Sequence, residues 1–252
     1  MENYVFEIDH LNVWIENKHI LKDICNLKIP KNTIFAIMGP SGSGKSTFLK
    51  LLNRLLELKK NVKIEGEIKF YGQDIFKIDP IRLRRRVGIV FQQPNPFYHM
   101  SIFDNVAYAL KANGLIKNKA DLINAVTEAL IRANLYDEVK DRLNKPASVL
   151  SGGQQQRLVI ARALALKPEV LLLDEPTSQI DVVGARKIEE LLISLKEQIT
   201  IILVSHTPQQ AARISDYVAL FYDGRLVEWG QSENIFTYPK NELTEKYVAG
   251  RI

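Results

Sequence analysis

The chain has 252 residues, of which 46% are hydrophobic and 25% are charged. This composition is typical of a folded globular protein and excludes disordered, collagen-like and disulfide-stabilised chains. No apolar run approaches the ~18 residues that a membrane-spanning helix needs, and the N-terminal MENYVFEIDH lacks the basic and apolar regions of a secretory signal. We therefore expect a soluble chain, and its single cysteine, Cys25, agrees with a reducing compartment.

The net charge of +5 suits a solvated surface, and it leaves open attraction to nucleic acid, to anionic lipid or to a phosphate-rich ligand. The glycines are more informative than the charge. Of only 13 glycines, five fall in two short stretches, at positions 39, 42 and 44 and at positions 152 and 153. Clustered glycines mark backbone that approaches another group closely, so both stretches are candidate binding segments.

The first third of the chain alternates apolar and polar residues, as strands with one solvated face do. This pattern predicts strands over 4–15, 19–29 and 66–75, which would form an antiparallel layer. Between them, 33–39 is almost continuously apolar, which is typical of a parallel strand buried on both faces. The segment 45–58 has apolar residues at three- and four-residue steps and is predicted to be a helix.

A second buried strand is predicted over 86–92, after which strand signals stop. Helical periodicity predicts helices over 102–111, 119–133 and 154–166. We therefore expect 94–166 to be a helical subdomain inserted into an α/β core.

The last third returns to buried strands, over 170–175 and 199–206, with a helix over 183–196 between them. The tail after Gly230 is expected to add short helices. Strands and helices in this order predict an α/β fold with a parallel sheet. The core would comprise two stretches, 1–93 and 167–252.

A phosphate-binding loop is predicted directly after the strand at 33–39. The motif G-x-x-x-x-G-K-[ST] occupies the turn from this strand into a helix, which is the structural context that it requires. Glycines there let backbone N–H groups surround a polyphosphate at a helix N-terminus. Lys45 would reach the β- and γ-phosphates, Ser46 would bind Mg²⁺, and Thr47 would support the loop. The predicted nucleotide ligands are Gly39, Pro40, Ser41, Gly42, Ser43, Gly44, Lys45, Ser46 and Thr47.

Two adjacent carboxylates, Asp174 and Glu175, end the strand at 170–175. Ligands of open α/β sheets bind at this carboxyl edge. Neighbouring residues of a strand point to opposite sides, so we expect different roles for the two. Asp174 would bind Mg²⁺, and Glu175 would act as the base for an attacking water.

Polar side chains also end two other predicted strands. His206 ends the strand at 199–206, where it could contact the γ-phosphate. Gln92 ends the strand at 86–92 and could join the metal and the attacking water. We expect both residues, together with Glu175 and Lys45, to take part in catalysis.

The second glycine cluster, Ser151-Gly152-Gly153-Gln154, precedes a predicted helix and is also suited to an anion. One polyphosphate does not need two such sites in one chain. The excess suggests a site shared between two chains.

With these motifs in this order, the sequence resembles the ATP-binding subunits of ABC transporters. The resemblance covers essentially the whole chain and is carried by GPSGSGKST, Gln92, LSGGQ, VLLLDEPT, Asp181 and His206. It implies a RecA-like P-loop NTPase core that binds ATP and Mg²⁺. It also implies a head-to-tail homodimer, in which Ser151, Gly152, Gly153 and Gln154 of one subunit face the ATP of the other, with Asp181 serving communication between them. Ile15 stands where the family stacks an aromatic side chain on adenine. The adjacent Trp14 is the candidate base contact, although on a regular strand it would point the other way.

A finer resemblance, to the ATPases of phosphate importers, covers 91–111, 135–158, 206–230 and 236–251. It implies two integral-membrane permease subunits, an indirect link to a solute-binding protein, and a peripheral location on the cytoplasmic face of the membrane. Importers of tungstate, molybdate or a polar amino acid remain alternatives. A non-transport ABC ATPase acting on DNA or ribosomes is a further alternative. It is disfavoured because the chain has no long coiled coil and no long basic run, so we expect no nucleic-acid partner.

Overall fold

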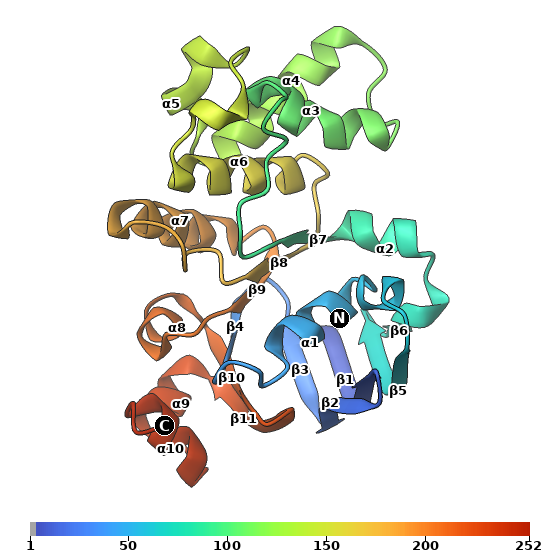
Figure 1. The fold of residues 1–252 in the computed structure, drawn as a ribbon, viewed down its shortest axis with the longest axis vertical. Coiled ribbons are helices and arrows are strands. Elements are labelled where there is room, and N and C mark those ends of the chain that lie inside the picture. The colour runs from blue at the N-terminus through green and yellow to red at the C-terminus, as the bar shows by residue number, and fades with distance from the viewer. Residues whose placement is uncertain (1–3) are drawn as a thin grey trace.

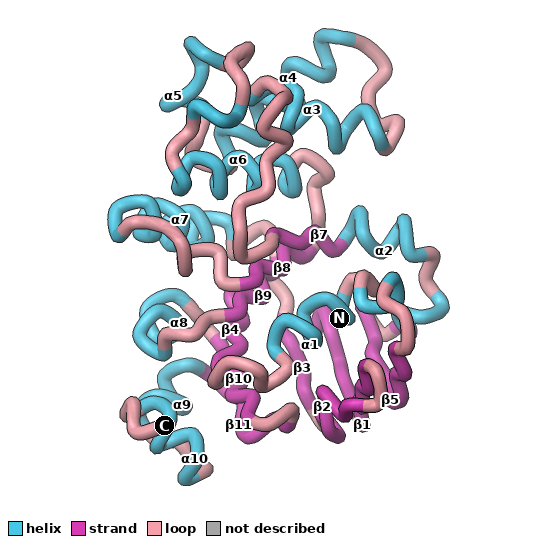
Figure 2. The backbone as a smooth tube through the Cα atoms, in the orientation of Figure 1, coloured by secondary structure: helices cyan, strands magenta, loops and turns pink. Residues whose placement is uncertain are grey.

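The computed structural model describes residues 4–252, so the first three residues of the expected core segment 1–93 lie outside it. The described residues form two β-sheets with helices around them, and a further group of helices lies at the top of the view (Figure 1). Figure 2 shows the two sheets as separate bodies of magenta strands. The α/β class and the two kinds of sheet predicted from the sequence are confirmed.

The larger sheet has six strands in the order β11-β10-β4-β9-β8-β7. All neighbours pair in parallel except β10 and β11, which form an antiparallel hairpin. Every residue of β4, β8 and β9 is buried, as their continuous apolar sequences require. The six strands are β4 (Ile34–Met38), β7 (Val87–Val90), β8 (Val170–Asp174), β9 (Thr200–Val204), β10 (Tyr217–Tyr222) and β11 (Arg225–Gln231).

The smaller sheet is antiparallel and has the order β2-β1-β5-β6, with β3 also paired to β1. Its strands alternate buried and more exposed residues, since one face packs on the core and the other meets solvent. Its strands are β1 (Tyr4–Ile15), β2 (Lys18–Ile24), β3 (Leu27–Pro30), β5 (Val62–Phe70) and β6 (Gln73–Asp74).

Helix α1 lies between the two sheets, and α7, α8 and α9 lie along the larger one (Figure 1). Helices α3 to α6 form the group at the top, and α10 lies next to the C-terminus. The helices are α1 (Lys45–Leu52), α2 (Pro80–Arg86), α3 (Ile102–Ala112), α4 (Lys119–Arg132), α5 (Tyr136–Val139), α6 (Gly152–Leu164), α7 (Val182–Leu195), α8 (Pro208–Ile214), α9 (Ser232–Thr237) and α10 (Glu242–Val248).

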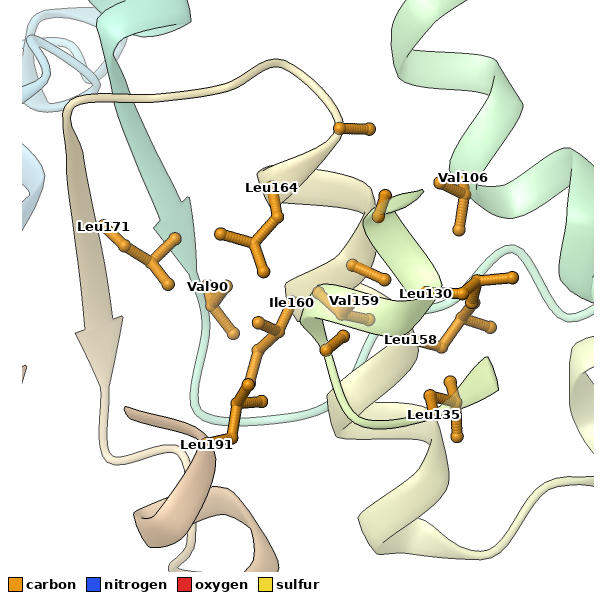
Figure 3. Packing of buried hydrophobic residues seen from close by; sticks show 14 of the residues in the cluster. Val90, Val106, Leu130, Leu135, Leu158, Val159, Ile160, Leu164, Leu171 and Leu191 are labelled. Atoms are coloured by element: carbon orange, nitrogen blue, oxygen red, sulfur yellow. The ribbon is translucent and has the colours of Figure 1, made fainter. Parts of the chain in front are cut away.

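Helix α6 joins the helical group to the larger sheet. Figure 3 shows its Leu164 and Ile160 turned toward Val90 and Leu171 of the sheet and Leu191 of α7. Leu158, on another side of the same helix, packs near the helical group. One hydrophobic cluster therefore runs from the sheet into the helices, so the position of α6 depends on both.

Three predicted elements differ from the structure. The helix predicted over 45–58 ends at Leu52, because Arg54 takes a left-handed φ of 60° and its guanidinium donates to the carbonyl of Ile78 at 2.7 Å. The strand predicted over 19–29 divides into β2 and β3 at Cys25 and Asn26, where Asn26 has φ 52°. The strand predicted over 66–75 instead runs over 62–70 and ends at the turn before β6.

The hairpin of β10 and β11 is not among the predicted strands. Its turn contains Asp223 and Gly224, both with positive φ, a pair that is a common signal for a tight hairpin. The short helices expected after Gly230 are present as α9 and α10. Within residues 4–252, no helix combines the length and the apolar character needed to cross a membrane.

Candidate functional site

The phosphate loop joins the end of β4 to the start of α1, as predicted. Gly39, Gly42 and Gly44 have φ of 144°, 82° and 96°, values that favour glycine. A Cβ on Gly39 would lie 2.0 Å from the backbone oxygen of Phe221. Gly44 stands at the N-cap position of α1, which has no side-chain cap and no acidic residue in its first turn. Its first N–H groups are thus available for an anion, and the loop fits a phosphate group.

Lys45 points back into this loop and is 4% exposed. Its Nζ donates to the carbonyl oxygens of Gly39 at 2.7 Å and Pro40 at 2.8 Å. Burial lowers the pKa of Lys45, against the opposing effect of the carboxylates of Glu175 and Asp174. The ammonium group is thus held where phosphate oxygens would replace carbonyl oxygens as its partners.

Ser46 and Asp174 come together across the loop and the end of β8. The Ser46 hydroxyl donates to Asp174 Oδ1 at 2.8 Å, and Asp174 is 6% exposed. A hydroxyl and a carboxylate are the hard oxygen ligands that Mg²⁺ prefers. These two residues therefore fit a magnesium ion bound beside the phosphates.

Glu175 is held apart from Asp174 by its backbone, since its φ is 50° and the strand ends before it. Its Oε2 accepts a hydrogen bond from Gln92 Nε2 at 3.0 Å, and its Oε1 contacts His206 Nε2. Burial raises the pKa of Glu175, and Asp174 adds to this, while His206 and Lys45 oppose it. A buried carboxylate with a raised pKa is suited to accepting a proton.

These groups surround one cleft of about 500 Å³. Gln92, Glu175 and His206 come from the ends of three different strand-loop connections, and the phosphate loop supplies the opposite wall. The cleft is lined by Ile20, Ser41, Gly42, Gly44, Lys45, Ser46, Thr47, Gln92, Glu175 and His206. The arrangement can hold a polyphosphate and place a base next to its terminal group.

Trp14 is not brought into this cleft. Its ring stacks on His19 with centroids 4.4 Å apart, and Lys63 Nζ lies 4.9 Å from the ring centroid. It lines a separate groove with Glu16 and Asn61. Ile20 of β2, which no sequence motif marks, lies at the cleft.

Residues 151–154 also lie outside the cleft of their own chain. Ser151 caps α6, and its backbone N–H donates a hydrogen bond to Gln154 Oε1 at 3.1 Å, which completes a reciprocal capping box. Gly152 is exposed, and a Cβ on it would meet nothing within 4 Å. Asp181 caps α7 through the N–H of Gly184 at 2.9 Å. Ser151 and Gly152 thus face solvent, whereas Gly153 is buried, and a Cβ on it would lie 3.2 Å from Gly184 Cα.

Two further residues support these sites and carry no motif in the sequence. Glu138 binds Gln154 Nε2 at 2.9 Å and pairs with both terminal nitrogens of Arg157 at 3.0 Å. Tyr247, near the C-terminus, accepts a hydrogen bond from the Gly39 N–H. Glu138 lies 16 residues from Gln154 in the sequence, and Tyr247 lies 208 residues from Gly39. No local sequence pattern therefore identifies either residue.

Comparison with known proteins decides the family. A model of the ABC transporter family matches residues 22–178. The chain belongs to the ABC transporter family. The matched segment runs from β2 through the phosphate loop and residues 151–154 to Ser178, and so includes most of the cleft. The chain is therefore an ABC ATPase, and the cleft is the candidate for its ATP site.

Curated relatives of this ABC ATPase match nearly its full length. The phosphate import ATP-binding protein PstB of Saccharolobus solfataricus is 62% identical over 249 residues, with 98% of this chain and 96% of the relative covered. The protein of the same name from Thermococcus kodakarensis is 56% identical, with 99% of each chain covered.

Among solved structures, cbiO1 of Clostridium perfringens, part of the ABC transporter complex cbiONQ, superimposes with a TM-score of 0.82 and 30% identity. That match covers 94% of this chain and 92% of cbiO1. A bacterial Atm1-family ABC exporter with ATP bound gives a TM-score of 0.81 at 26% identity, covering all of this chain and 42% of the exporter.

Proposed function

We propose that this chain is the ATP-hydrolysing subunit of an importer of inorganic phosphate. The observation that carries the proposal for the transported solute is the 62% identity, over 98% of the chain, to a protein named for phosphate import. The cleft supports the hydrolytic half of the proposal, because a buried carboxylate lies opposite a phosphate loop.

In the proposed reaction, Lys45 and the N–H groups at the start of α1 hold the β- and γ-phosphates of ATP. Glu175 accepts a proton as a water oxygen attacks the γ-phosphorus, and Gln92 and His206 keep its carboxylate in position. The bond from the γ-phosphorus to the β–γ bridging oxygen breaks, which leaves ADP and inorganic phosphate. When bound by Ser46 and Asp174, Mg²⁺ would neutralise charge on the phosphates.

We also propose that two copies of the chain form a head-to-tail dimer. Residues 151–154 support this, because they combine an exposed glycine with a helix N-terminus and yet do not line the cleft of their own chain. Facing the γ-phosphate held by a second copy would give them a ligand. Asp181, exposed at the start of α7, would lie near the same contact.

The partners proposed for this dimer are two membrane permease subunits, which would hold it at the cytoplasmic face of the membrane, and indirectly a solute-binding protein. Residues that follow Gln92 support a docking role, since Tyr98 and Tyr108 are about half exposed at 51% and 48%. In this proposal residues 94–166 form a subdomain that passes changes at Gln92 to the permeases, and the rest of the chain forms the core.

Reconstitution with the permease subunits in vesicles tests the solute. We expect labelled phosphate to enter the vesicles only with ATP on the side of this chain, and the phosphate-loaded binding protein to raise ATP hydrolysis. Stimulation by tungstate, molybdate or an amino acid, with no response to phosphate, would show that the proposed solute is wrong. ATP hydrolysis that no binding protein alters would contradict a role in import.

A further inference from the structure

A cluster of metal-ligand side chains lies in the antiparallel sheet, and neither the ATP site nor the proposed transport function uses it. It consists of Asp9 and His10 of β1, Asp23 of β2, and Cys25 at the corner before β3. Ligand atoms of Asp9, His10 and Cys25, the chain's only cysteine, lie within 4.8 Å of one another, and Asp23 contacts both His10 and Cys25.

The donor atoms of this cluster are close together. His10 Nδ1 lies 3.0 Å from Asp23 Oδ1 and 3.2 Å from Cys25 Sγ, and Cys25 Sγ lies 3.1 Å from Asp23 Oδ1. A carboxylate oxygen of Asp9 lies within 4.8 Å of both the His10 nitrogen and the Cys25 sulfur. Ligands of a tetrahedral Zn²⁺ lie about 3.3–3.8 Å from one another when they are about 2.0–2.3 Å from the metal. Movements of about half an ångström would therefore fit His10, Asp23 and Cys25 to the ion, and the Asp9 carboxylate would have to approach by up to about 1 Å.

Two irregularities of the sheet create this arrangement. Asp9 pairs with Glu67 and Asn12 with Glu65, so His10 and Leu11 together oppose the single residue Gly66. His10 takes a φ of 47°, and a Cβ on Gly66 would lie 2.3 Å from the His10 carbonyl oxygen. This β-bulge needs a glycine on the facing strand and changes the direction of the His10 side chain.

The second irregularity lies on the other edge of β1. Leu11 pairs with Ile24 and Val13 with Leu21, so Asn12 alone opposes two residues of β2, one of which is Asp23 with φ 52°. The two bulges thus bring His10 and Asp23 together from neighbouring strands. Left-handed backbone at non-glycine residues is uncommon, and here it occurs at both of these ligands.

The oxygens of Asp9 are also held in place. Asp9 Oδ1 accepts a hydrogen bond from the backbone N–H of Asn26 at 3.1 Å. Its other oxygen stays available to an ion. The site is open to water, since the side chains of His10 and Asp23 are 73% and 56% exposed. An ion can therefore enter without unfolding the sheet.

We propose that Asp9, His10, Asp23 and Cys25 bind a zinc ion, which fastens β1 to the corner between β2 and β3. Mixed thiolate, imidazole and carboxylate ligands suit Zn²⁺ and disfavour Mg²⁺ and Ca²⁺, which take oxygen ligands. None of the four ligands lines the ATP cleft, so the ion would stabilise the sheet and take no part in hydrolysis. Strand β2, which carries Asp23, also carries Ile20 at that cleft.

Cobalt binding tests the site directly, because tetrahedral Co²⁺ with a thiolate ligand shows a sulfur-to-cobalt charge-transfer band. Cys25 is the only thiol, so the band reports this site alone. The reduced full-length chain is titrated with Co²⁺ in excess Mg²⁺, which occupies the ATP site. We expect the band to saturate at one Co²⁺ per chain and to disappear when Zn²⁺ is added. The absence of the band at saturating Co²⁺ would overturn the proposal.

Variants distinguish a built site from a cysteine that binds metal by itself. Cys25→Ser should remove the band, and His10→Asn and Asp23→Asn should each weaken Co²⁺ binding about 10-fold or more. Asparagine tolerates the left-handed backbone at both positions. His99→Ala, at an exposed histidine elsewhere, should leave the titration unchanged. Equal Co²⁺ affinity in wild type, His10→Asn and Asp23→Asn would overturn the proposal.

Thermal unfolding gives a second readout that does not depend on ATP hydrolysis. We expect Zn²⁺ to raise the melting temperature of the wild type by about 2–4 °C and to leave that of Cys25→Ser unchanged. The ATPase activity of Cys25→Ser should equal that of the wild type and so confirm that it folds. An equal shift with Zn²⁺ in both proteins would place the effect at another site and contradict the proposal.

Discussion

The hydroxyl of Tyr247 accepts a hydrogen bond from the backbone N–H of Gly39 at 3.1 Å. The same hydroxyl donates to the carbonyl of His206 at 3.4 Å. Tyr247 is 6% exposed, and burial raises its pKa. Helix α10 thus contacts both Gly39, the first residue of the phosphate loop, and His206, which itself contacts Glu175.

Tyr247→Phe should lower the free energy of unfolding by about 1 kcal/mol, because the buried Gly39 N–H loses its partner while the ring still fills its place. The melting temperature should fall by about 2–4 °C, and ATP hydrolysis should slow because the loop is less well held. Calorimetry and a phosphate-release assay measure the two effects. Tyr238→Phe, at a tyrosine that is 79% exposed, is the matched control. Identical behaviour of the two variants would show that the hydroxyl has no structural role.

Glu175→Gln should reduce ATP hydrolysis by about 100-fold or more, because the amide cannot accept the proton of the attacking water. The amide has nearly the same size, so ATP affinity should stay close to that of the wild type, and the variant should accumulate as an ATP-bound dimer. Turnover, calorimetry and size-exclusion chromatography with ATP provide the measurements. Glu190→Gln, on the exposed side of α7, is the control and should match the wild type in turnover, ATP affinity and oligomeric state. A fully active Glu175→Gln monomer would refute the assignment of the base.

Lys45→Ala should weaken ATP binding itself by about 10- to 100-fold, since charge-assisted hydrogen bonds contribute about 1.5–3 kcal/mol. Isothermal calorimetry with ATP and Mg²⁺ is the direct test. Lys50→Ala removes the same charge from the last turn of the same helix and should keep wild-type affinity. An unchanged dissociation constant for Lys45→Ala would argue against its place at the phosphates.

Ser151→Arg should leave ATP binding to the monomer unchanged and block formation of the ATP-dependent dimer. The added side chain would occupy the surface that a second copy is proposed to use, while the cleft of the same chain lies elsewhere. Sedimentation of Ser151→Arg in the Glu175→Gln background with ATP detects the dimer. Thr237→Arg, at the exposed end of α9, should still dimerise. Dimers of Ser151→Arg with wild-type turnover would contradict the shared site.

Glu138 makes part of the stability pH-dependent. Its pairing with buried Arg157 lowers its pKa from 4.5 to about 2, against the effect of burial, and Lys187 and Gln154 add to the lowering. A carboxyl whose folded pKa is depressed stabilises the fold above its unfolded pKa, and this contribution disappears as the pH falls. The loss should begin near pH 4.5 and be complete below about pH 2.

Glu138→Gln should therefore lower the free energy of unfolding at pH 7 by about 1.5–3 kcal/mol, as expected for lost charged hydrogen bonds. The difference from the wild type should shrink as the pH falls below 4.5. Thermal melts over this range measure it. Glu128→Gln, which removes an exposed pair with Lys167, should change stability by less than about 1 kcal/mol. If the free energy of unfolding of Glu138→Gln differed from that of the wild type by the same amount at every pH, the charge of Glu138 would not contribute to stability.

Contacts between residues that are distant in the sequence explain where the structure differs from the sequence prediction. The helix predicted over 45–58 ends early because the Arg54 side chain bonds to the carbonyl of Ile78, a contact that no local pattern encodes. The place of Trp14 next to Ile15 predicts a contact with the base, but its ring stacks on His19 in a groove apart from the cleft. The roles assigned to Trp14, Asp181 and residues 151–154 remain predictions.

The sequence by itself determined the α/β class, the phosphate loop and the family, because continuous apolar strands and a glycine-rich turn into a helix are local patterns. Only the tertiary structure decided which side chains meet. Glu175 reaches Gln92 across 83 residues, and Tyr247 reaches Gly39 across 208. The cluster of His10, Asp23 and Cys25 exists because two bulges redirect side chains that regular strands would keep apart. Such contacts depend on how strands pair and pack, which neighbours in the sequence do not specify.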